Sequence, residues 1–244
     1  MTKLYEARQH ILIRTGYSDP VRHCHMAAHI ILSMDGDMTV TAEGEDRVCR
    51  GAMIPSGVSH MVDTRGNPAL VFLYDCTTET AKSIRHVRSI PPESCRQILA
   101  AYAALEHDGT AVRYGAFERF LLSQLGLTGA PCPVNDERIT SAMQYIRAMS
   151  ASPLSCRDAA GVTHLSQSRF SHLFKEQVGM TFSSYLIYQR LMRVYAETLR
   201  GRSITEAALE AGFSSSAHFA DVNRRVFGIP ASTVMQNLVL IRVQ

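Results

Sequence analysis

One pattern of helix signals occurs twice in the second half of the chain, at an offset of 48 residues. The first copy runs from Ser155 to Met180, and the second begins at Ser203. In each copy a serine stands three residues before an acid, Asp158 or Glu206, which is the spacing of a capping box at a helix start. A break, an amphipathic segment and a closing glycine follow in both copies. The duplication therefore predicts two similar helical hairpins.

The second helix of the first hairpin is predicted to be polar on one face and apolar on the other. Its apolar residues, Phe170, Leu173, Phe174 and Val178, recur at helical spacing. Its polar residues are Gln167, Ser168, Arg169, Ser171, His172 and Lys175. A polar, acid-poor helix on a short hairpin suits insertion into a DNA major groove, although ordinary amphipathic hairpins share the pattern.

The spacing between the hairpins and the charge of this region favour a nucleic-acid partner. A long helix is predicted from Phe182 to about Leu199, and a stiff spacer of this kind can place two helix-turn-helix units in successive major grooves, about 34 Å apart. From Pro131 onwards there are 12 Lys and Arg against 8 Asp and Glu, whereas the preceding residues have 13 against 14. A structural repeat without a ligand is the alternative.

Several residues of the repeat resemble a known signature. They are Gly179, Gly212-Phe213, Ser216-Ala217-His218-Phe219 and Phe227-Gly228-Ile229-Pro230. This set resembles the signature of the AraC/XylS family of bacterial transcription regulators, over about the last 105 residues. The resemblance implies seven helices that hold two helix-turn-helix units. It also implies an N-terminal cupin-like domain for sensing and dimerisation.

The resemblance also implies which side chains face DNA. In the first unit they are the six polar residues of the amphipathic helix given above, Gln167 to Lys175. In the second unit they are Ser216, Ala217, His218, Ala220, Asp221 and Arg224. Arg169 and His172 can donate to base acceptors, and Lys175 and Arg224 suit phosphate. His218 either contacts DNA or serves as a structural hydrogen bonder.

The second unit departs from the family pattern at two positions. Asp221 stands where a basic residue is usual, and Asn223 stands where a buried phenylalanine is usual. An acid on the groove-facing side opposes phosphate, although it can accept from a cytosine amino group. Ala217 and Ala220 can contact only a thymine methyl group. We therefore expect the first unit to supply most of the base readout.

Residues 4–78 predict strands rather than helices, because short apolar or alternating runs recur between glycines and prolines. The runs are Ile11–Ile13, His29–Leu32, Met38–Thr41, Val48–Ile54 and Ala69–Tyr74. Such spacing is typical of a small antiparallel barrel or jelly roll. The predicted fold class is α+β in two domains: a small antiparallel β-barrel, cupin- or jelly-roll-like, followed by helices, and then an all-α domain with two helix-turn-helix units.

The change from strands to helices is marked by Pro91-Pro92. Two amphipathic helices follow, from Glu93 to about Glu106 and around Phe117–Leu125, and they can bury their apolar faces on the β domain or on a second copy of the chain. From Asn135, an expected helix cap, the chain is predicted to be all helical. The predicted parts are an effector-sensing domain at 1–90, a helical dimerisation segment at 91–127, a linker at 128–134 and a double helix-turn-helix domain at 135–240.

Four histidines of the β region have a spacing that resembles the two cupin motifs. The pattern is His23-x-His25-x3-His29-x6-Gly36, then Pro55-x-Gly57-x2-His60, with His29 in the place of the usual glutamate. We expect residues 23, 25, 27 and 29 to share one face of a strand, with His60 on a neighbouring strand. Four imidazoles would then meet in a barrel mouth and suit zinc, nickel, copper or iron. An organic effector in the same pocket, or a vestigial pocket, is the alternative.

The leading hypothesis is a sequence-specific DNA-binding transcription regulator, controlled by a small organic molecule or a metal ion in the barrel. Its expected partners are double-stranded operator DNA, RNA polymerase if it is an activator, an effector and a second copy of the chain. A metal-dependent cupin enzyme with a helical appendage is the alternative, but no catalytic residues are assigned. No Walker loop, GxSxG elbow, G-x-G-x-x-G unit or CxxC pair occurs. Without an apolar run of 18 residues or a signal peptide, we expect a cytoplasmic protein and no membrane partner.

Overall fold

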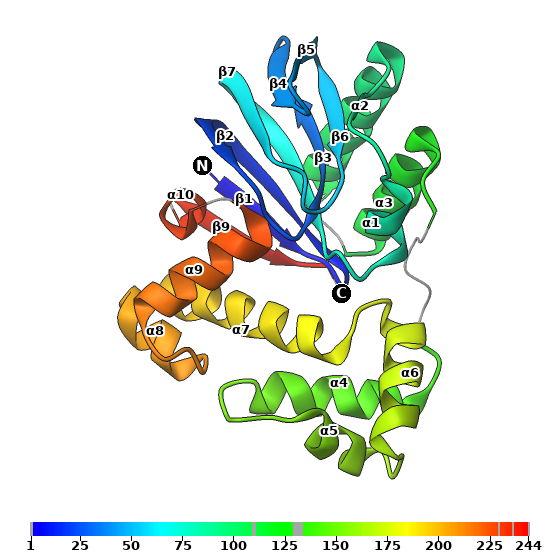
Figure 1. The fold of residues 1–244 in the computed structure, drawn as a ribbon, viewed down its shortest axis with the longest axis vertical. Helices are drawn as coiled ribbons and strands as arrows, with labels where there is room; N and C mark the ends of the chain where they lie inside the picture. Colours follow the sequence, from blue (N-terminus) through cyan, green and yellow to red (C-terminus); the bar gives the residue numbers. More distant parts are fainter. Residues whose placement is uncertain (1, 109–110, 129–133, 229, 236, 244) are drawn as a thin grey trace. The chain divides into compact units, whose positions relative to one another are not determined.

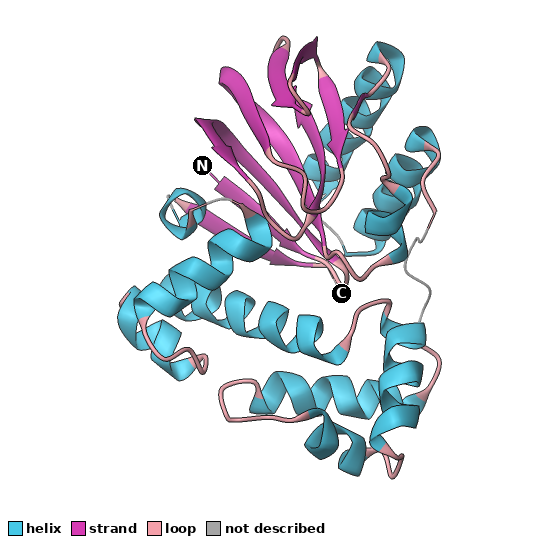
Figure 2. Ribbon diagram, in the orientation of Figure 1, coloured by secondary structure: helices cyan, strands magenta, loops and turns pink. Residues whose placement is uncertain are grey.

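The fold was analysed in a computed structural model of the chain. It describes residues 2–108, 111–128, 134–228, 230–235 and 237–243. Its contacts divide the chain into two compact units: a sheet unit, Met1–Ala130 with Arg224–Gln244, and a helical unit, Pro131–Asn223. The predicted α+β class is confirmed (Figure 2). The finer boundaries given above stay predictions, and most of the predicted linker 128–134 lies outside the described residues.

The sheet unit holds one sheet, whose described strands are β1 (Thr2–Glu6), β2 (His10–His23), β3 (Ala28–Ser33), β4 (Met38–Ala42), β5 (Glu45–Cys49), β6 (Gly51–Ile54), β7 (His60–Tyr74), β8 (Arg88–Ser89) and β9 (Leu238–Arg242). Hydrogen bonding joins them in the order β8-β6-β3-β7-β2-β1-β9, and β4 pairs with both β5 and β7 (Figure 1). Each described pair is antiparallel except β1–β9, which is parallel.

The two longest strands, β2 and β7, pair with each other along their length and bend together near the middle. The register of β2 shifts between Gly16 and Ser18. Strand β7 passes through left-handed backbone at Arg65 and Gly66, with φ of 54° and 79°. One half of β7 pairs with β3, and the other half pairs with β4. Through these bends, β2 and β7 pass together from the layer of the sheet that contains β3 into the layer that contains β4.

The bends bring together residues that the strand register holds far apart. His29 of β3 pairs with Leu73 near one end of β7, whereas His60 is the first residue of β7. A straight strand would separate these two ends by about 40 Å. The ring centroids of His29 and His60 are nevertheless 5.0 Å apart. The sheet therefore curls on itself, in the barrel-like manner that the strand spacing predicted.

Helices α2 (Pro92–Asp108) and α3 (Ala111–Leu125) pack on the sheet, and a short α1 (Glu79–Ser83) precedes them. Buried Tyr102 and Phe117 belong to the same hydrophobic cluster as Leu12 and Phe72 of the sheet. The apolar faces predicted for these helices thus bury largely on the sheet of their own chain. Their role in dimerisation stays a prediction.

A polar cluster lies buried between α3 and the sheet. His10 Nε2 lies 2.7 Å from the Tyr114 hydroxyl, and its Nδ1 lies 3.2 Å from Glu118 Oε1. The Tyr74 hydroxyl also donates to Glu118, at 3.4 Å. Burial raises the pKa of Glu118 to about 7 and lowers the pKa of His10 to about 3. Both pKa values shift in these directions because burial disfavours the charged form of each side chain.

The helical unit contains α4 (Glu137–Met149), α5 (Cys156–Val162), α6 (Gln167–Val178), α7 (Phe182–Leu199) and α8 (Ile204–Glu210), and α9 (Ser216–Phe227) begins in it. The predicted capping boxes at Ser155 and Ser203 are both present. Gly179 closes α6 in left-handed backbone, with φ of 79°. The local signals that defined the repeat therefore produce the predicted elements, including the long helix α7.

Three sequence-based predictions of element boundaries were wrong. Asp136, not Asn135, caps α4 with its side chain. The run Val48–Ile54 is two strands, β5 and β6, separated at Arg50. The chain after Asn135 is not all helical, because β9 follows the short α10 (Ala231–Met235) and pairs with β1. Only the distant β1 supplies the hydrogen-bond partners that make residues 238–242 a strand.

The departure at Asn223 is compensated inside the helical unit. In the first hairpin, the Phe174 ring packs against Tyr185, with ring centroids 5.5 Å apart. In the second, Asn223 is fully buried and accepts a 2.6 Å hydrogen bond from the Tyr195 hydroxyl. A polar pair thus replaces the aromatic pair, and it satisfies an amide oxygen that would be costly to bury alone.

We predict that Tyr195→Phe lowers the free energy of unfolding by about 1–3 kcal/mol, because Asn223 Oδ1 loses its hydroxyl donor in a buried site. Urea unfolding of the full chain measures the change. The double variant Tyr195→Phe/Asn223→Leu should recover most of the loss, since both polar groups are then removed. An unfolding midpoint of Tyr195→Phe equal to that of the native chain would contradict the prediction.

We also predict that Glu118 makes stability fall as pH rises. Its pKa is higher in the folded chain, so its contribution is fully present below the ordinary carboxyl pKa and is lost as pH rises through about 7. The loss is about 3 kcal/mol, because each pKa unit is worth about 1.4 kcal/mol. The thermal unfolding temperature of Glu118→Gln, relative to that of the native chain, should therefore rise between pH 5 and pH 8. The exposed Glu93→Gln serves as the control, and parallel curves for Glu118→Gln and the native chain would refute the assignment.

Candidate DNA-binding face and histidine cluster

The two hairpins share one turn geometry. His164 joins α5 to α6 in left-handed backbone, with φ of 54°. Gly212, which matches His164 at the repeat offset, joins α8 to α9 with φ of 86°. A Cβ on Gly212 would lie 2.8 Å from the Ala151 carbonyl oxygen, so glycine is required there by space as well as by φ. In both hairpins, a residue with left-handed backbone therefore joins the first helix to the second, which is α6 or α9.

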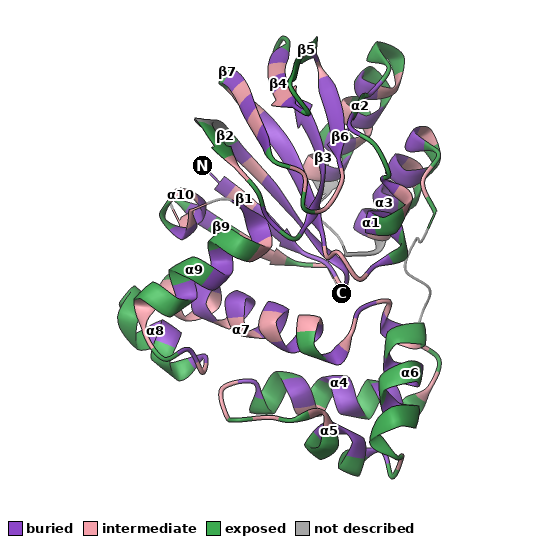
Figure 3. Cartoon of the chain, viewed as in Figure 1, coloured by how far each residue is buried: buried purple, intermediate pink, exposed green. Residues whose placement is uncertain are grey.

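The polar face of α6 is fully available to a partner. Each of its six predicted contact residues, from Gln167 to Lys175, is exposed, whereas Phe170 and Phe174 are buried beneath them (Figure 3). The Ser171 hydroxyl donates to the Gln167 carbonyl of its own helix. In the described part of the chain, the side chains of Arg169 and His172 make no hydrogen bond, and Arg169 is bonded through its backbone N–H. Their donors are therefore free for a ligand outside the chain.

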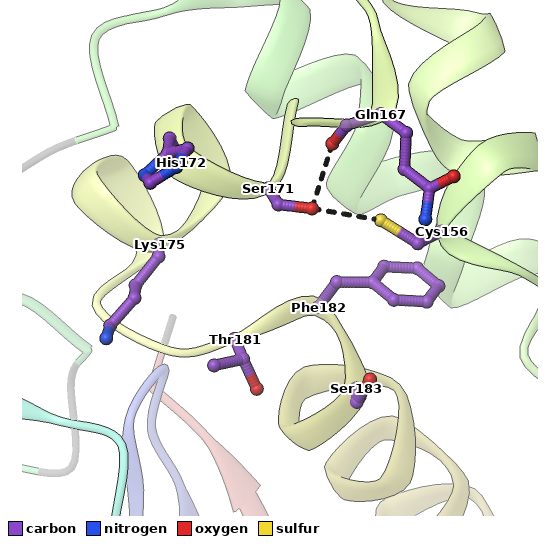
Figure 4. Close-up of a pocket in the computed structure, with 8 residues that line it drawn as sticks. All are labelled: Cys156, Gln167, Ser171, His172, Lys175, Thr181, Phe182 and Ser183. Atoms are coloured by element: carbon purple, nitrogen blue, oxygen red, sulfur yellow. Dashed lines mark hydrogen bonds between the residues drawn. The ribbon is translucent and has the colours of Figure 1, made fainter. Parts of the chain in front are cut away.

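A cavity of about 410 Å³ lies beside this face, between α6 and the start of α7 (Figure 4). Its lining residues are Cys156, Gln167, Ser171, His172, Lys175, Thr181, Phe182 and Ser183. Cys156 Sγ lies 3.2 Å from Ser171 Oγ at its rim, and Lys175 extends along another side. The sequence indicated four of the residues that line this cavity, Gln167, Ser171, His172 and Lys175, but gave no sign of the wall formed by residues 181–183.

The corresponding face of α9 is less uniform. Ala217, Ala220 and Asp221 are exposed, as are His218 and Arg224, and Ser216 is half-buried. His218 Nδ1 accepts from the Ser214 backbone N–H at 3.2 Å, and the His218 backbone N–H donates to Ser215 Oγ at 3.0 Å. One nitrogen of His218 is thus used to hold the turn. The division between the two units falls inside α9, between Asn223 and Arg224.

The four predicted histidines of the sheet unit lie together. His23 and His60 are paired residues of β2 and β7, with ring centroids 4.4 Å apart. His25 lies 5.1 Å from His60 and 4.1 Å from His29, between ring centroids. Among the described residues, potential ligand atoms of His23, His25 and His60 all lie within 4.8 Å of one another. His29 packs against this group of three but is not part of it.

The expected reason for this convergence was wrong. Strand β2 ends at His23, residues 24–27 lie outside any strand, and β3 begins at Ala28. Residues 23, 25, 27 and 29 therefore do not share one face of a strand. The loop of residues 24–27 turns the His25 ring towards the cluster, and the Gly57 N–H donates to the His25 carbonyl at 3.0 Å.

Backbone carbonyls define the tautomers of two histidines. His23 Nδ1 lies 2.9 Å from the Val21 oxygen, and His60 Nδ1 lies 2.8 Å from the Val58 oxygen. Because a carbonyl can only accept, each Nδ1 carries the proton and each Nε2 presents a lone pair. These Nε2 atoms are buried and have no hydrogen-bond partner, like both ring nitrogens of His29. Unsatisfied acceptors at this density are costly unless something binds them.

Burial keeps the rings in the form that binds metal. It lowers the pKa of His25 to about 3 and that of His60 to about 4, with the neighbouring histidines adding to the shift. Burial also places the pKa of His29 well below its usual value. The rings are therefore neutral near pH 7, and only a neutral imidazole can ligate a metal. The cluster lacks a carboxylate, so its donor set suits zinc, nickel, copper or iron rather than magnesium or calcium.

The C-terminal end of the chain contacts this cluster, which no sequence pattern indicated. The backbone N–H groups of Met26 and Ala27 donate to the carbonyls of Arg225 and Val226, at 2.8 and 3.2 Å. A Cβ on Gly228 would lie 2.1 Å from His25 Cδ2, so the ring rests directly on the glycine backbone. Both partners belong to the sheet unit. The sequence indicated Gly228 only as the closing glycine of the repeat and as part of the signature Phe227-Gly228-Ile229-Pro230.

Comparison with known proteins identifies relatives of the C-terminal part. A helix-turn-helix domain model matches residues 159–237. The regulatory protein PocR of Salmonella typhimurium is 29% identical over 112 residues, which are 46% of this chain and 37% of PocR. The chain spans little more than a third of the length of the curated relatives it matches.

Solved structures match both parts. The structure of ToxT from Vibrio cholerae covers 93% of this chain and 97% of its own, with a TM-score of 0.53 and 10% identity, which shows a common fold. An AraC-type DNA-binding domain protein from Chromobacterium violaceum is 31% identical, covers 41% of this chain and 89% of its own, and has a TM-score of 0.37.

Among the helices described, none has the length and hydropathy that crossing a membrane requires. The signature residues of the repeat now stand on two helix-turn-helix units, and the matching family model and regulator relatives agree with them. The C-terminal part of the chain therefore carries a helix-turn-helix domain, and it is similar to the matching part of the regulatory protein PocR.

Proposed function

We propose that this protein binds double-stranded operator DNA in a sequence-specific manner and regulates transcription from it. The observation that carries the proposal is the exposed face of α6, which presents free guanidinium and imidazole donors, an amide and a lysine on a rigid hairpin. Such groups match base-edge acceptors and phosphates of a major groove. PocR and LumQ of Photobacterium leiognathi are regulators by name, and the enzyme alternative has no comparable support.

The two hairpins contribute unequally to this proposed interaction. On α6, Arg169 and His172 are positioned to donate to bases, and Lys175 at the cavity rim is positioned to bind phosphate. On α9, Ala217 and Ala220 offer no hydrogen bond, and Asp221 repels phosphate. The nitrogen of His218 that holds Ser214 is not available. The first hairpin is therefore the main base-reading unit, and the second adds backbone contacts through Arg224.

A ligand in the histidine cluster controls the proposed activity. Two occupants fit different observations. The unpartnered Nε2 atoms of His23 and His60, with both tautomers held by carbonyls, favour a transition-metal ion, since metal-binding histidines usually donate their other N–H in this way. An organic acid is the alternative, because ToxT has been crystallised with (E)-4-(8-methylnaphthalen-1-yl)but-3-enoic acid. A homodimer, and RNA polymerase for an activator, complete the proposed partners.

Selection of bound DNA from a random pool, with and without chelator, tests the proposal and yields the operator. With that operator, we predict that His172→Ala weakens binding by about tenfold or more, since one base contact is worth about 1–3 kcal/mol. Ser216→Ala should cost less. Lys175→Gln should weaken binding to all sequences alike and reduce the salt dependence by about one ion.

Each outcome has a distinct meaning. Failure to enrich any sequence would contradict specific DNA binding itself. An equal or larger loss from Ser216→Ala than from His172→Ala would contradict the leading role of the first hairpin. Arg138→Ala is the matched control, because Arg138 is exposed but lies at the start of α4, where its side chain pairs with Asp136.

A further inference from the structure

The sheet unit contains a direct contact between the histidine cluster and the last turn of α9, a helix that carries proposed DNA contacts. Three observations define it. The loop of residues 24–27 donates two hydrogen bonds to the Arg225 and Val226 carbonyls. The His25 ring lies against Gly228, where no side chain fits. Gly228 itself closes α9, with its N–H donating to the Arg224 carbonyl at 2.7 Å.

We propose that binding of a transition-metal ion by His23, His25 and His60 strengthens the docking of the last turn of α9 onto loop 24–27, through the contact of His25 with Gly228. This coupling deepens the proposed function, on which its regulatory meaning rests. Through this contact, metal binding at the cluster would affect α9, a helix with proposed DNA contacts. The path needs no intermediate element, because His25 belongs to both the cluster and the contact.

The geometry of metal binding explains why a bound ion would act on the His25 ring. Zinc–nitrogen bonds of about 2.0–2.1 Å place tetrahedral ligand atoms about 3.4 Å apart. The candidate ligand atoms here are spread over as much as 4.8 Å, so a bound ion draws the three rings closer together. His23 and His60 are each held by a backbone carbonyl at Nδ1, whereas neither ring nitrogen of His25 has a hydrogen-bond partner among the described residues. The orientation of His25 instead depends on loop 24–27 and Gly228.

Because the orientation of His25 depends on loop 24–27 and Gly228, metal binding is expected to strengthen the docking of α9 rather than weaken it. When α9 is docked, the bonds from Met26 and Ala27 hold the loop, and Gly228 restricts the His25 ring. A docked α9 therefore preorganises the third ligand, and the docked state binds metal more tightly. Thermodynamic linkage then requires the metal to favour docking by the same factor. The backbone amides of Met26 and Ala27 report docking directly, since they donate the bonds that undocking breaks.

The repeat offers a matched control for Gly228. Gly179 closes α6 with φ of 79°, Gly228 closes α9 with φ of 72°, and each N–H donates to the carbonyl four residues earlier. Gly179→Ala and Gly228→Ala therefore carry similar strain from left-handed backbone. Gly179 belongs to the helical unit, whereas Gly228 contacts His25. Any difference between the variants in metal affinity arises from that contact rather than from helix closure.

The first experiment measures zinc binding to the full chain, purified without a histidine tag and stripped with chelator. We expect one Zn²⁺ per chain by elemental analysis, and a Co²⁺-substituted absorption spectrum typical of nitrogen ligands. Affinity should fall at least tenfold in His60→Ala and in Gly228→Ala, but not in Gly179→Ala. The exposed His86→Ala controls for loss of a histidine outside the cluster. No retained zinc, or equal affinities in the two glycine variants, would overturn the proposal.

The second experiment measures amide hydrogen exchange with and without Zn²⁺. Exchange at Met26 and Ala27 should slow at least tenfold with zinc in the native chain, while the Gly179 amide stays unchanged. His60→Ala removes one candidate ligand and leaves the contact of His25 with Gly228 in place, so it should abolish the effect of zinc. It also keeps the test valid if Gly228→Ala fails to fold. Unchanged exchange at Met26 and Ala27 despite bound zinc would refute the coupling. Slowed exchange without any effect of zinc on operator affinity would support the coupling and contradict ligand control in the proposed function.

Discussion

The paired bend of β2 and β7 is the constraint on which the sheet unit depends. Each strand alone would be an ordinary extended segment, but they turn together, at a register shift in one and at left-handed Arg65 and Gly66 in the other. One turn thereby forms two layers and brings the start of β7 back beside the start of β3. The histidine cluster exists because of this turn, since its members come from strand ends that a flat sheet would separate.

A second constraint is the burial of groups that need partners. The amide of Asn223 is satisfied by Tyr195, and the carboxyl of Glu118 lies among two tyrosines and a histidine. The cluster of His23, His25, His29 and His60 differs, because several of its ring nitrogens have no partner. A folded chain tolerates such atoms rarely. The number of unpartnered nitrogens gathered in one cluster is the reason why we propose a ligand there.

The duplicated hairpins show how one fold element can be preserved while its use diverges. Caps, turns and closing glycines are equivalent in the two copies, since helix geometry requires them in both. The contact faces differ: α6 is exposed along its polar side, whereas α9 has small and acidic residues there and shares its last turn with the sheet unit. In our proposals, the first copy reads DNA and the last turn of the second copy responds to the histidine cluster.

The sequence by itself determined the repeated hairpins, their caps and the polar face of α6, because these depend on residues within a few positions of each other. It also indicated the four histidines, but with the wrong geometry, since residues 24–27 are a loop. Only the tertiary structure decided that β9 pairs with β1, that Tyr195 bonds Asn223 and that His25 rests on Gly228. These contacts join distant parts of the chain. No local sequence pattern predicts these contacts, because the two partners of each contact come together only when the sheet and the helices have folded.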